Sequence, residues 1–139
     1  MSVQTIRYIK SHKQNQANEA LNIAVIDKAG SGNASHHYHI TGYNSKTNSS
    51  CPFIARYGRP AEHSTILFQN GPIQEVGVNG ITHEALIAVV IDRLECFQSG
   101  PYSNEYNQEA LESLRDALAA LQTRTAIRTA RGVEGTHTI

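Results

Sequence analysis

Four side chains in the second half of the chain have the chemistry to hold a small nucleotide: Phe97, Asn107, Arg124 and Arg128. An aromatic ring offers a stacking face for a base, and an amide can read a base or ribose edge. Two arginines one helical turn apart offer planar donors for phosphate. Without a ligand, Phe97 would be ordinary core, Asn107 a polar helix start and the arginines a solvated helix end. Spacing alone leaves both interpretations open.

Histidines are the second group of side chains that could bind a metal or take part in catalysis. His37 and His39 alternate along one predicted strand, while His36 and His63 lie elsewhere. A metal site would need a third ligand brought into range, so we expect surface or pocket-lining histidines and no metal. The alternative to a nucleotide-binding protein is an enzyme: a hydrolase of the phosphodiesterase type that uses these histidines. A purely structural or protein-binding helical module is the third hypothesis.

The two cysteines and the glycine-rich stretch offer no stronger site. Cys51 and Cys96 fall in a predicted loop and a predicted helix, with no CxxC and no second pair to complete a zinc site. Inside a packed helix, the Cys96 thiol would be inert. Gly30-Ser31-Gly32 lacks the remaining glycine spacing of a dinucleotide fingerprint, and no GxxxxGK[ST] occurs. We therefore expect no cofactor and a reducing, cytosolic setting.

Composition restricts the class of partner. The 139 residues suit one domain, and equal numbers of acidic and basic residues remove the electrostatic drive towards long nucleic acids or anionic membranes. No stretch has the length of a signal peptide or membrane span, so a soluble, intracellular protein is expected. We expect one domain over residues 1–139: a sheet layer to residue 80, a helical hairpin over 81–131 and a tail over 132–139.

The first half of the chain is typical of a small antiparallel sheet. β-branched and alternating runs predict a hairpin from Leu21–Asp27 and His36–Tyr43, followed by an exposed polar loop over 44–52. Ser64–Phe68 is a further predicted strand, and Thr5–Ile9 a predicted edge strand. The fold class is therefore α+β.

Two helices with short connections are predicted in the second half. Thr82 can cap the first helix, and the carboxylate of Glu84 in its first turn suits the helix dipole. This helix must stop near Gly100-Pro101, because proline disfavours helical geometry. A second helix over 104–131 ends at Gly132. The short turn predicts an antiparallel hairpin.

Heptad-like spacing defines the apolar line along each helix. On the first helix Leu86, Val89 and Ile91 lie off that line, so its apolar surface is wider than one partner helix covers. We therefore expect self-association. The lines are His83, Ile87, Val90, Leu94 and Phe97 on the first helix, and Asn107, Leu111, Leu114, Leu118, Leu121, Thr125 and Arg128 on the second.

Several strings in the second half resemble a known family. They are residues 68–81 (FQNGPIQEVGVNGI), 91–95 (IDRLE), 97–101 (FQSGP) and 131–136 (RGVEGT). They are similar to the phage Thoeris anti-defence sponges, whose C-terminal hairpin is shared with anti-CBASS cyclic-dinucleotide sponges. The first half resembles the family only in its strand-loop-strand pattern and in His36-His37-Tyr38.

The resemblance implies a non-enzymatic protein of the infected host's cytoplasm that binds cyclic nucleotide immune signals without degrading them. The foremost ligand would be glycocyclic ADP-ribose, made by TIR-domain enzymes, with cyclic di- and trinucleotides as further ligands. Phe97 and Asn107 match the family's positions that hold glycocyclic ADP-ribose, and Arg124 and Arg128 match its cyclic oligonucleotide pocket. The resemblance also implies dimers that assemble into hexamers, with pockets shared between chains.

Overall fold

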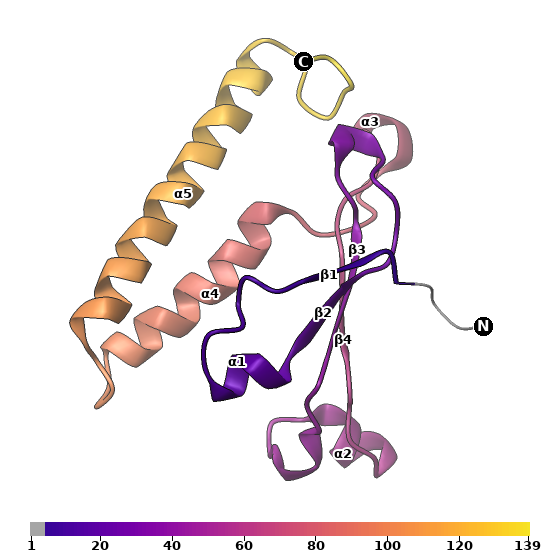
Figure 1. Ribbon diagram of the computed structural model, residues 1–139. Coiled ribbons are helices and arrows are strands. Elements are labelled where there is room, and N and C mark those ends of the chain that lie inside the picture. Colours follow the sequence, from indigo (N-terminus) through magenta and orange to yellow (C-terminus); the bar gives the residue numbers. More distant parts are fainter. Residues whose placement is uncertain (1–4) are drawn as a thin grey trace. The chain divides into compact units, whose positions relative to one another are not determined.

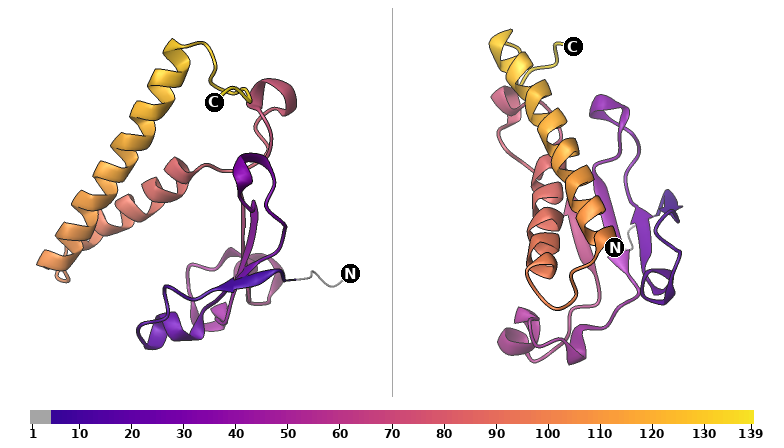
Figure 2. Two further views of the ribbon diagram at one scale, coloured as in Figure 1. Left: turned by 45° about the horizontal axis from the view of Figure 1, so that its top comes forward. Right: turned by 90° about the vertical axis from the view of Figure 1, so that its left-hand side faces the viewer.

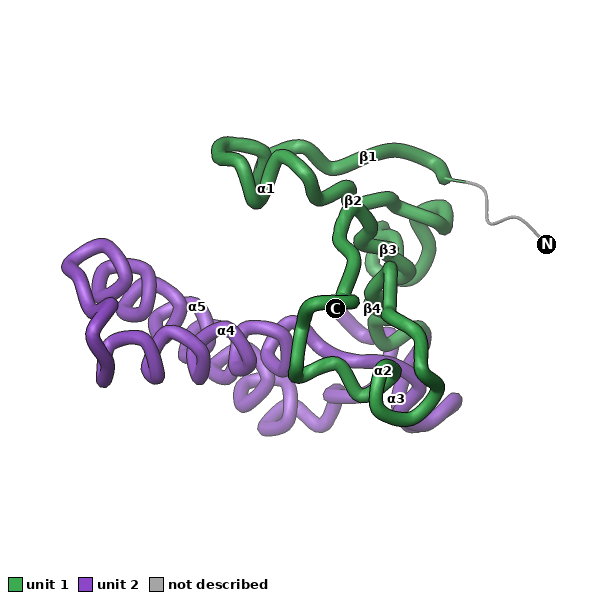
Figure 3. The backbone as a smooth tube through the Cα atoms, turned by 90° about the horizontal axis from the view of Figure 1, so that it is seen from below, with its two compact units in different colours: residues 1–70 green, residues 71–139 purple. Residues whose placement is uncertain are grey.

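The computed structural model describes residues 5–139 and divides into two compact units, with the boundary between residues 70 and 71 (Figure 3). The first unit contains the sheet and the second contains the helical hairpin. The predicted α+β class, with an N-terminal antiparallel sheet and C-terminal helices, is confirmed. The assignment of both units to one domain stays a prediction.

The sheet of the first unit is an antiparallel meander (Figure 1). Its strands are β1 (Arg7–Ile9), β2 (Asn22–Val25), β3 (His37–Thr41) and β4 (Ser64–Leu67), and each pairs with the next along the chain. β1 lies at one edge and β4 at the other. The predicted hairpin, the further strand and the edge strand are all present, each slightly shorter than expected.

Strand register gives the sheet two chemically different faces. His39 lies opposite Ala24 on one side and Thr65 on the other, while its neighbour Ile40 lies opposite Ile23. Because side chains alternate along a strand, His37 and His39 share one face. The opposite face carries the apolar side chains Ile9, Ile23, Val25, Tyr38, Ile40 and Ile66. Val25, at 0% exposure, is the most buried of them.

Short helical turns connect the strands. They are α1 (Gln16–Ala20), the 3₁₀ turns η1 (Ser31–Asn33) and η2 (Ser45–Thr47), and α2 (Pro52–Tyr57). The predicted loop over 44–52 is therefore partly helical. Gly42 is required where β3 ends, since its φ is +98° and a Cβ there would lie 1.9 Å from the Ala20 carbonyl oxygen.

Helices α3 (Ile73–Val76), α4 (His83–Gln98) and α5 (Glu105–Ala130) form the second unit. Thr82 Oγ1 accepts a hydrogen bond from the Ala85 N–H at 3.1 Å and so caps α4 as predicted. Asn104 caps α5 in the same way. Figures 1 and 2 show α4 and α5 running antiparallel from their connecting turn.

The apolar line of α4 differs from the predicted one by one position. Val90, placed on the line, is 41% exposed, whereas Ile91, placed off it, is 8% exposed. The face towards α5 is also marked by an ion pair of 3.4 Å between Glu95 and Arg115. On α5 the predicted line holds, with Leu111 at 2% exposure. The assignment of Val90 is wrong because apolar residues surround α4, so periodicity does not single out one face.

Much apolar surface of the second unit stays open to solvent. The exposed side chains include Val78, Ile81, Val89, Val90, Tyr102, Tyr106 and Ile127. Burying a Val or Ile side chain contributes roughly 1.5–3 kcal/mol, so covering several of them would stabilise an assembly. Self-association stays a prediction. Within residues 5–139 no helix has both the length and the apolar character to cross a membrane.

Candidate functional site

An apolar hollow of about 520 Å³ lies beside Phe97 at the end of α4. Val89, Arg93 and Phe97 follow one another at four-residue intervals, so they lie along one line of the helix surface. Residues of the turn after α4, including Tyr102, also line the hollow. The walls include Val89, Asp92, Arg93, Cys96, Phe97 and Tyr102.

Charge and aromatic surface meet inside this hollow. The Arg93 guanidinium lies over the Phe97 ring, 5.1 Å from its centroid, which is a cation–π arrangement. The Tyr102 ring lies edge-on to Phe97, with 6.4 Å between centroids. Two aromatic rings and a planar cation are side chains that can stack on a base and bind phosphate. Sequence reasoning missed Arg93 and Tyr102, although the four-residue spacing from Arg93 to Phe97 was a usable signal.

Asn107 does not line this hollow. Its backbone N–H donates to Asn104 Oδ1 at 2.8 Å, and its side chain makes no hydrogen bond among the described residues. It begins the line of α5 that packs towards α4, and it is absent from the residues that line the hollow beside Phe97. Within one chain, Phe97 and Asn107 therefore do not share a pocket.

Gln98 fixes the turn between the two helices. Its Oε1 accepts from the Asn104 N–H at 3.1 Å, and its Nε2 donates to the Asn104 carbonyl at 3.0 Å and to Gln108 Oε1 at 3.2 Å. One amide thus joins the end of α4 to the cap and first turn of α5. The Asn104 side-chain amide donates to the Tyr102 carbonyl at 3.1 Å, which ties the backbone of Tyr102 to the same turn.

The two predicted arginines differ in their surroundings. Arg124 is exposed and makes no side-chain hydrogen bond or ion pair within residues 5–139. The Arg128 side chain is only 13% exposed and binds Glu134 Oε2 through Nε at 2.9 Å. Its other donors bind carbonyl oxygens of the tail at 2.7–3.3 Å, namely those of Val133, Thr136 and Thr138.

The tail around Arg128 is also held by α3. The chain reverses at Gly132, where φ is +72° and the Val133 N–H donates to the Arg128 carbonyl at 3.0 Å. The Gln74 amide then donates to the Glu134 carbonyl at 3.0 Å. Arg128 is therefore the centre of a folded tail, a contact that the sequence did not predict.

His36 has a structural position. It is 6% exposed, and its backbone N–H donates to both oxygens of Asp27 at 2.9 and 3.0 Å. Burial acts to raise the pKa of Asp27, but backbone hydrogen bonds from His37 and His36 outweigh it and hold this pKa below its usual value. His36 thus helps to close the loop between β2 and β3, and it is buried where a surface or pocket-lining position was predicted.

Cys51 has an activated thiol. Ser45 Oγ donates to Sγ at 3.2 Å, and this hydrogen bond, followed by backbone N–H groups, lowers the pKa of the Cys51 thiol to about 7. Ser45 is itself buried and accepts from the Ala61 N–H at 2.6 Å, so the donor is well positioned. No histidine pairs with this thiol among the described residues, so the nucleophile–base pair of a hydrolase is not formed here.

We expect Cys51 to be alkylated by iodoacetamide with a rate that is half-maximal near pH 7, because the thiolate is the reactive species. Peptide mass spectrometry after timed quenching would measure Cys51 and Cys96 in the same sample. Half-maximal alkylation of Cys51 above pH 8, as for an ordinary thiol, would contradict this assignment.

Residues 60–126 match the Acb2/Tad1 hairpin domain, so the helical hairpin of this chain is similar to that domain. The matched segment contains Phe97, Asn107 and Arg124, and it ends two residues before Arg128. The chain is also 49% identical over 74 residues to Thoeris anti-defense 1 of Bacillus phage SBSphiJ7. That alignment covers 53% of this chain and 52% of the relative, so the chain spans about half of the relative's length. The predicted relationship to the phage Thoeris anti-defence family is confirmed.

Proposed function

We propose that this protein is a phage anti-defence protein that binds cyclic nucleotide immune signals and withholds them without degrading them. The primary ligand is glycocyclic ADP-ribose, and the site of action is the cytoplasm of the infected bacterium. The observation that carries the proposal is the hollow beside Phe97, which lies within the segment that matches the Acb2/Tad1 hairpin domain. The name of the phage relative, Thoeris anti-defense 1, supports the anti-defence role.

The chemistry of the hollow suits a purine nucleotide with phosphates. Phe97 and Tyr102 provide surfaces on which an adenine can stack, and such stacking contributes roughly 1–3 kcal/mol per base. Arg93 provides a planar cation for the pyrophosphate. The apolar wall formed by Val89 excludes water from these contacts.

A second copy of the chain completes this pocket. Asn107 does not reach the hollow of its own chain, and its amide has no partner among the described residues, so it is available to a ligand held by another chain. The exposed side chains of α4, including Val89 and Val90, supply apolar surface for such a dimer. The resemblance to the phage Thoeris anti-defence sponges implies that such dimers associate further into a hexamer.

Arg124 and Arg128 form the second proposed pocket, for the phosphates of cyclic di- or trinucleotides. They lie one turn apart on α5, on the same side of the helix. Arg124 is free to bind phosphate, whereas Arg128 must exchange tail acceptors for phosphate oxygens or bind through its one remaining N–H.

Sequestration works by mass action. Free signal falls only while binding sites exceed signal molecules, so the protein must be abundant and its affinity high. A nanomolar Kd corresponds to about −12 kcal/mol. The experiment that separates sequestration from hydrolysis is recovery of the bound molecule: a sponge returns its ligand intact after denaturation, and a hydrolase returns a product.

A further inference from the structure

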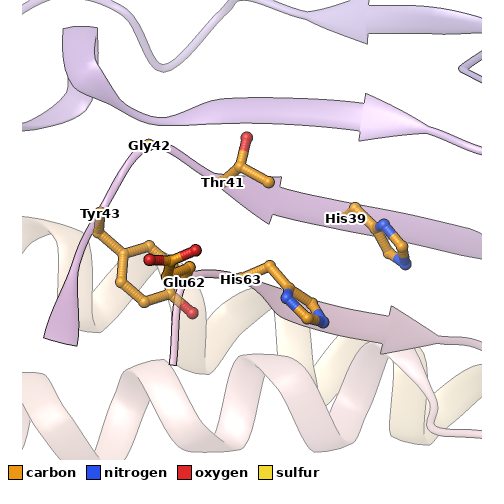
Figure 4. A pocket seen from close by; sticks show the side chains of 6 residues that line it. All are labelled: His39, Thr41, Gly42, Tyr43, Glu62 and His63. Carbon is orange, nitrogen blue, oxygen red and sulfur yellow. The ribbon is translucent and has the colours of Figure 1, made fainter. Parts of the chain in front are cut away.

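Three histidines gather on one face of the sheet, in the first unit. His37 and His39 share this face because they are two residues apart on β3. His63, just before β4, is on the same face as Thr65, which lies opposite His39. Figure 4 shows the His39 and His63 rings beside a common hollow, with Glu62 nearby. Its volume is about 490 Å³.

The geometry of the His37–His39 pair is that of two ligands of one ion. Their Nε2 atoms are 3.1 Å apart. Two nitrogens about 2.05 Å from a shared zinc ion and separated by this distance subtend roughly 100°, close to a tetrahedral angle. Both side chains are half-buried, so their positions are restricted by the surrounding structure.

Ring orientation supports the same conclusion. An imidazole nitrogen lies about 1.1 Å from its ring centre, so a linear N–H···N bond of this length would place the centres about 5.3 Å apart. The observed separation is 4.7 Å, with the planes at 81°. The rings are therefore bent relative to the line between their nitrogens, as expected when both lone pairs point to one position about 2 Å away.

The charges around the pair favour a cation over an anion. The Glu62 carboxylate lines the same hollow, where it attracts a cation and repels a phosphate. Neutral imidazole is a preferred ligand of Zn²⁺, Cu²⁺ and Ni²⁺.

We propose that His37 and His39 form a binding site for a divalent transition-metal ion of the Zn²⁺ class. Within residues 5–139 no three histidine, cysteine, aspartate or glutamate side chains converge on one point. The protein therefore supplies two ligands, and water fills the other coordination positions. The site uses other residues than the proposed nucleotide pockets, which lie on the hairpin. The two proposals can therefore be tested independently.

Isothermal titration of the full chain with ZnCl₂ at pH 7.5 tests this site, after removal of any histidine tag. We expect one ion per chain, bound at least tenfold more weakly in His37→Gln and in His39→Gln, because each variant keeps only one of the two protein ligands. His137→Gln is the matched control, since this exposed histidine pairs with Glu75 at 3.6 Å in the second unit. Binding should be lost at pH 5.5, where protons compete for the imidazoles.

An ordinary hydrogen bond between the two rings is the competing explanation, and it predicts no zinc uptake. Absent binding, unchanged affinity in His39→Gln, or an equal loss in His137→Gln would overturn the proposal. Circular dichroism shows whether each variant is folded. If a variant is not folded, the native protein is treated with diethyl pyrocarbonate with and without zinc. Histidine nitrogens that bind zinc cannot react, so zinc should protect His37 and His39 from modification. Equal modification with and without zinc would refute the site.

Discussion

Replacing Phe97 and Asn107 together by alanine strongly weakens binding of glycocyclic ADP-ribose, because it removes both ligand contacts proposed for the hollow at the end of α4. Loss of a stacking face costs roughly 1–3 kcal/mol, and loss of the hydrogen bond between Asn107 and the ligand adds about 1 kcal/mol. Since each 1.4 kcal/mol is a factor of ten, the double variant should bind at least tenfold to several hundredfold more weakly. Isothermal titration calorimetry measures the change.

The control for this variant is Phe53→Ala, which removes an exposed aromatic ring from α2 in the first unit. Its affinity for glycocyclic ADP-ribose should equal that of the unchanged protein. Light scattering should give the double variant the same mass as the unchanged protein, because neither Phe97 nor Asn107 is among the exposed apolar side chains that an assembly would cover. Unaltered affinity in the double variant would refute the site.

Mixing the two single variants shows whether the pocket is shared between chains. Phe97→Ala and Asn107→Ala chains, unfolded and refolded together, should regain part of the binding capacity that each lacks alone. A mixed dimer then contains one intact pocket, formed by Asn107 of the first chain and Phe97 of the second. If both residues belonged to one chain's pocket, no mixture would recover binding.

Arg124→Ala and Arg128→Ala should weaken cyclic oligonucleotide binding with different side effects. Arg124 has no side-chain partner among the described residues, so its loss should leave stability and glycocyclic ADP-ribose affinity unchanged. Arg128→Ala additionally removes the guanidinium around which the tail folds. The hydrogen bonds between this guanidinium and the tail together contribute about 1–3 kcal/mol to stability, a figure reduced by solvent screening at the half-exposed Glu134. A melting temperature lowered only in Arg128→Ala is the expected result.

Hydrogen exchange of residues 133–138 provides the matching local measurement. In Arg128→Ala these amides should exchange faster, because the acceptors of the guanidinium lose their donor. Arg124→Ala should leave their exchange unchanged. Two results would contradict the assignment: equal loss of both ligand types in Arg124→Ala, which argues against two distinct pockets, or an unprotected tail in the unchanged protein.

The sequence predicted those parts of the fold that depend on local signals. Thr82 caps its helix as expected, because the N-cap oxygen binds an N–H group within the same turn. The strands were predicted from β-branched runs and alternation. The short helices α1 and α2 were not predicted, since five or six residues are too few to show helical periodicity.

The site was only partly predictable, because it depends on tertiary placement. Phe97 was singled out by its residue type and position, and the structure places it beside a hollow. Its neighbour Tyr102 comes from the turn, whose conformation depends on the Gln98 bonds. The role of Arg128 in the tail depends on the chain reversal at Gly132, which no periodic pattern indicates.

The histidines were assessed from strand alternation alone, which placed His37 and His39 on one face and gave no distance between their rings. The separation of 3.1 Å between the Nε2 atoms depends on side-chain rotamers that a sequence does not specify. A two-ligand site was therefore not proposed at that level.

Recovery of the bound signal is the measurement that tests the central claim most directly. The protein is incubated with glycocyclic ADP-ribose, freed of unbound ligand by gel filtration, and heated to denature it; the released molecule is then identified by mass spectrometry. Sequestration predicts near-stoichiometric recovery of intact glycocyclic ADP-ribose from the unchanged protein and little from the Phe97→Ala, Asn107→Ala double variant. A ring-opened or cleaved product, or no ligand retained by the unchanged protein, would contradict it.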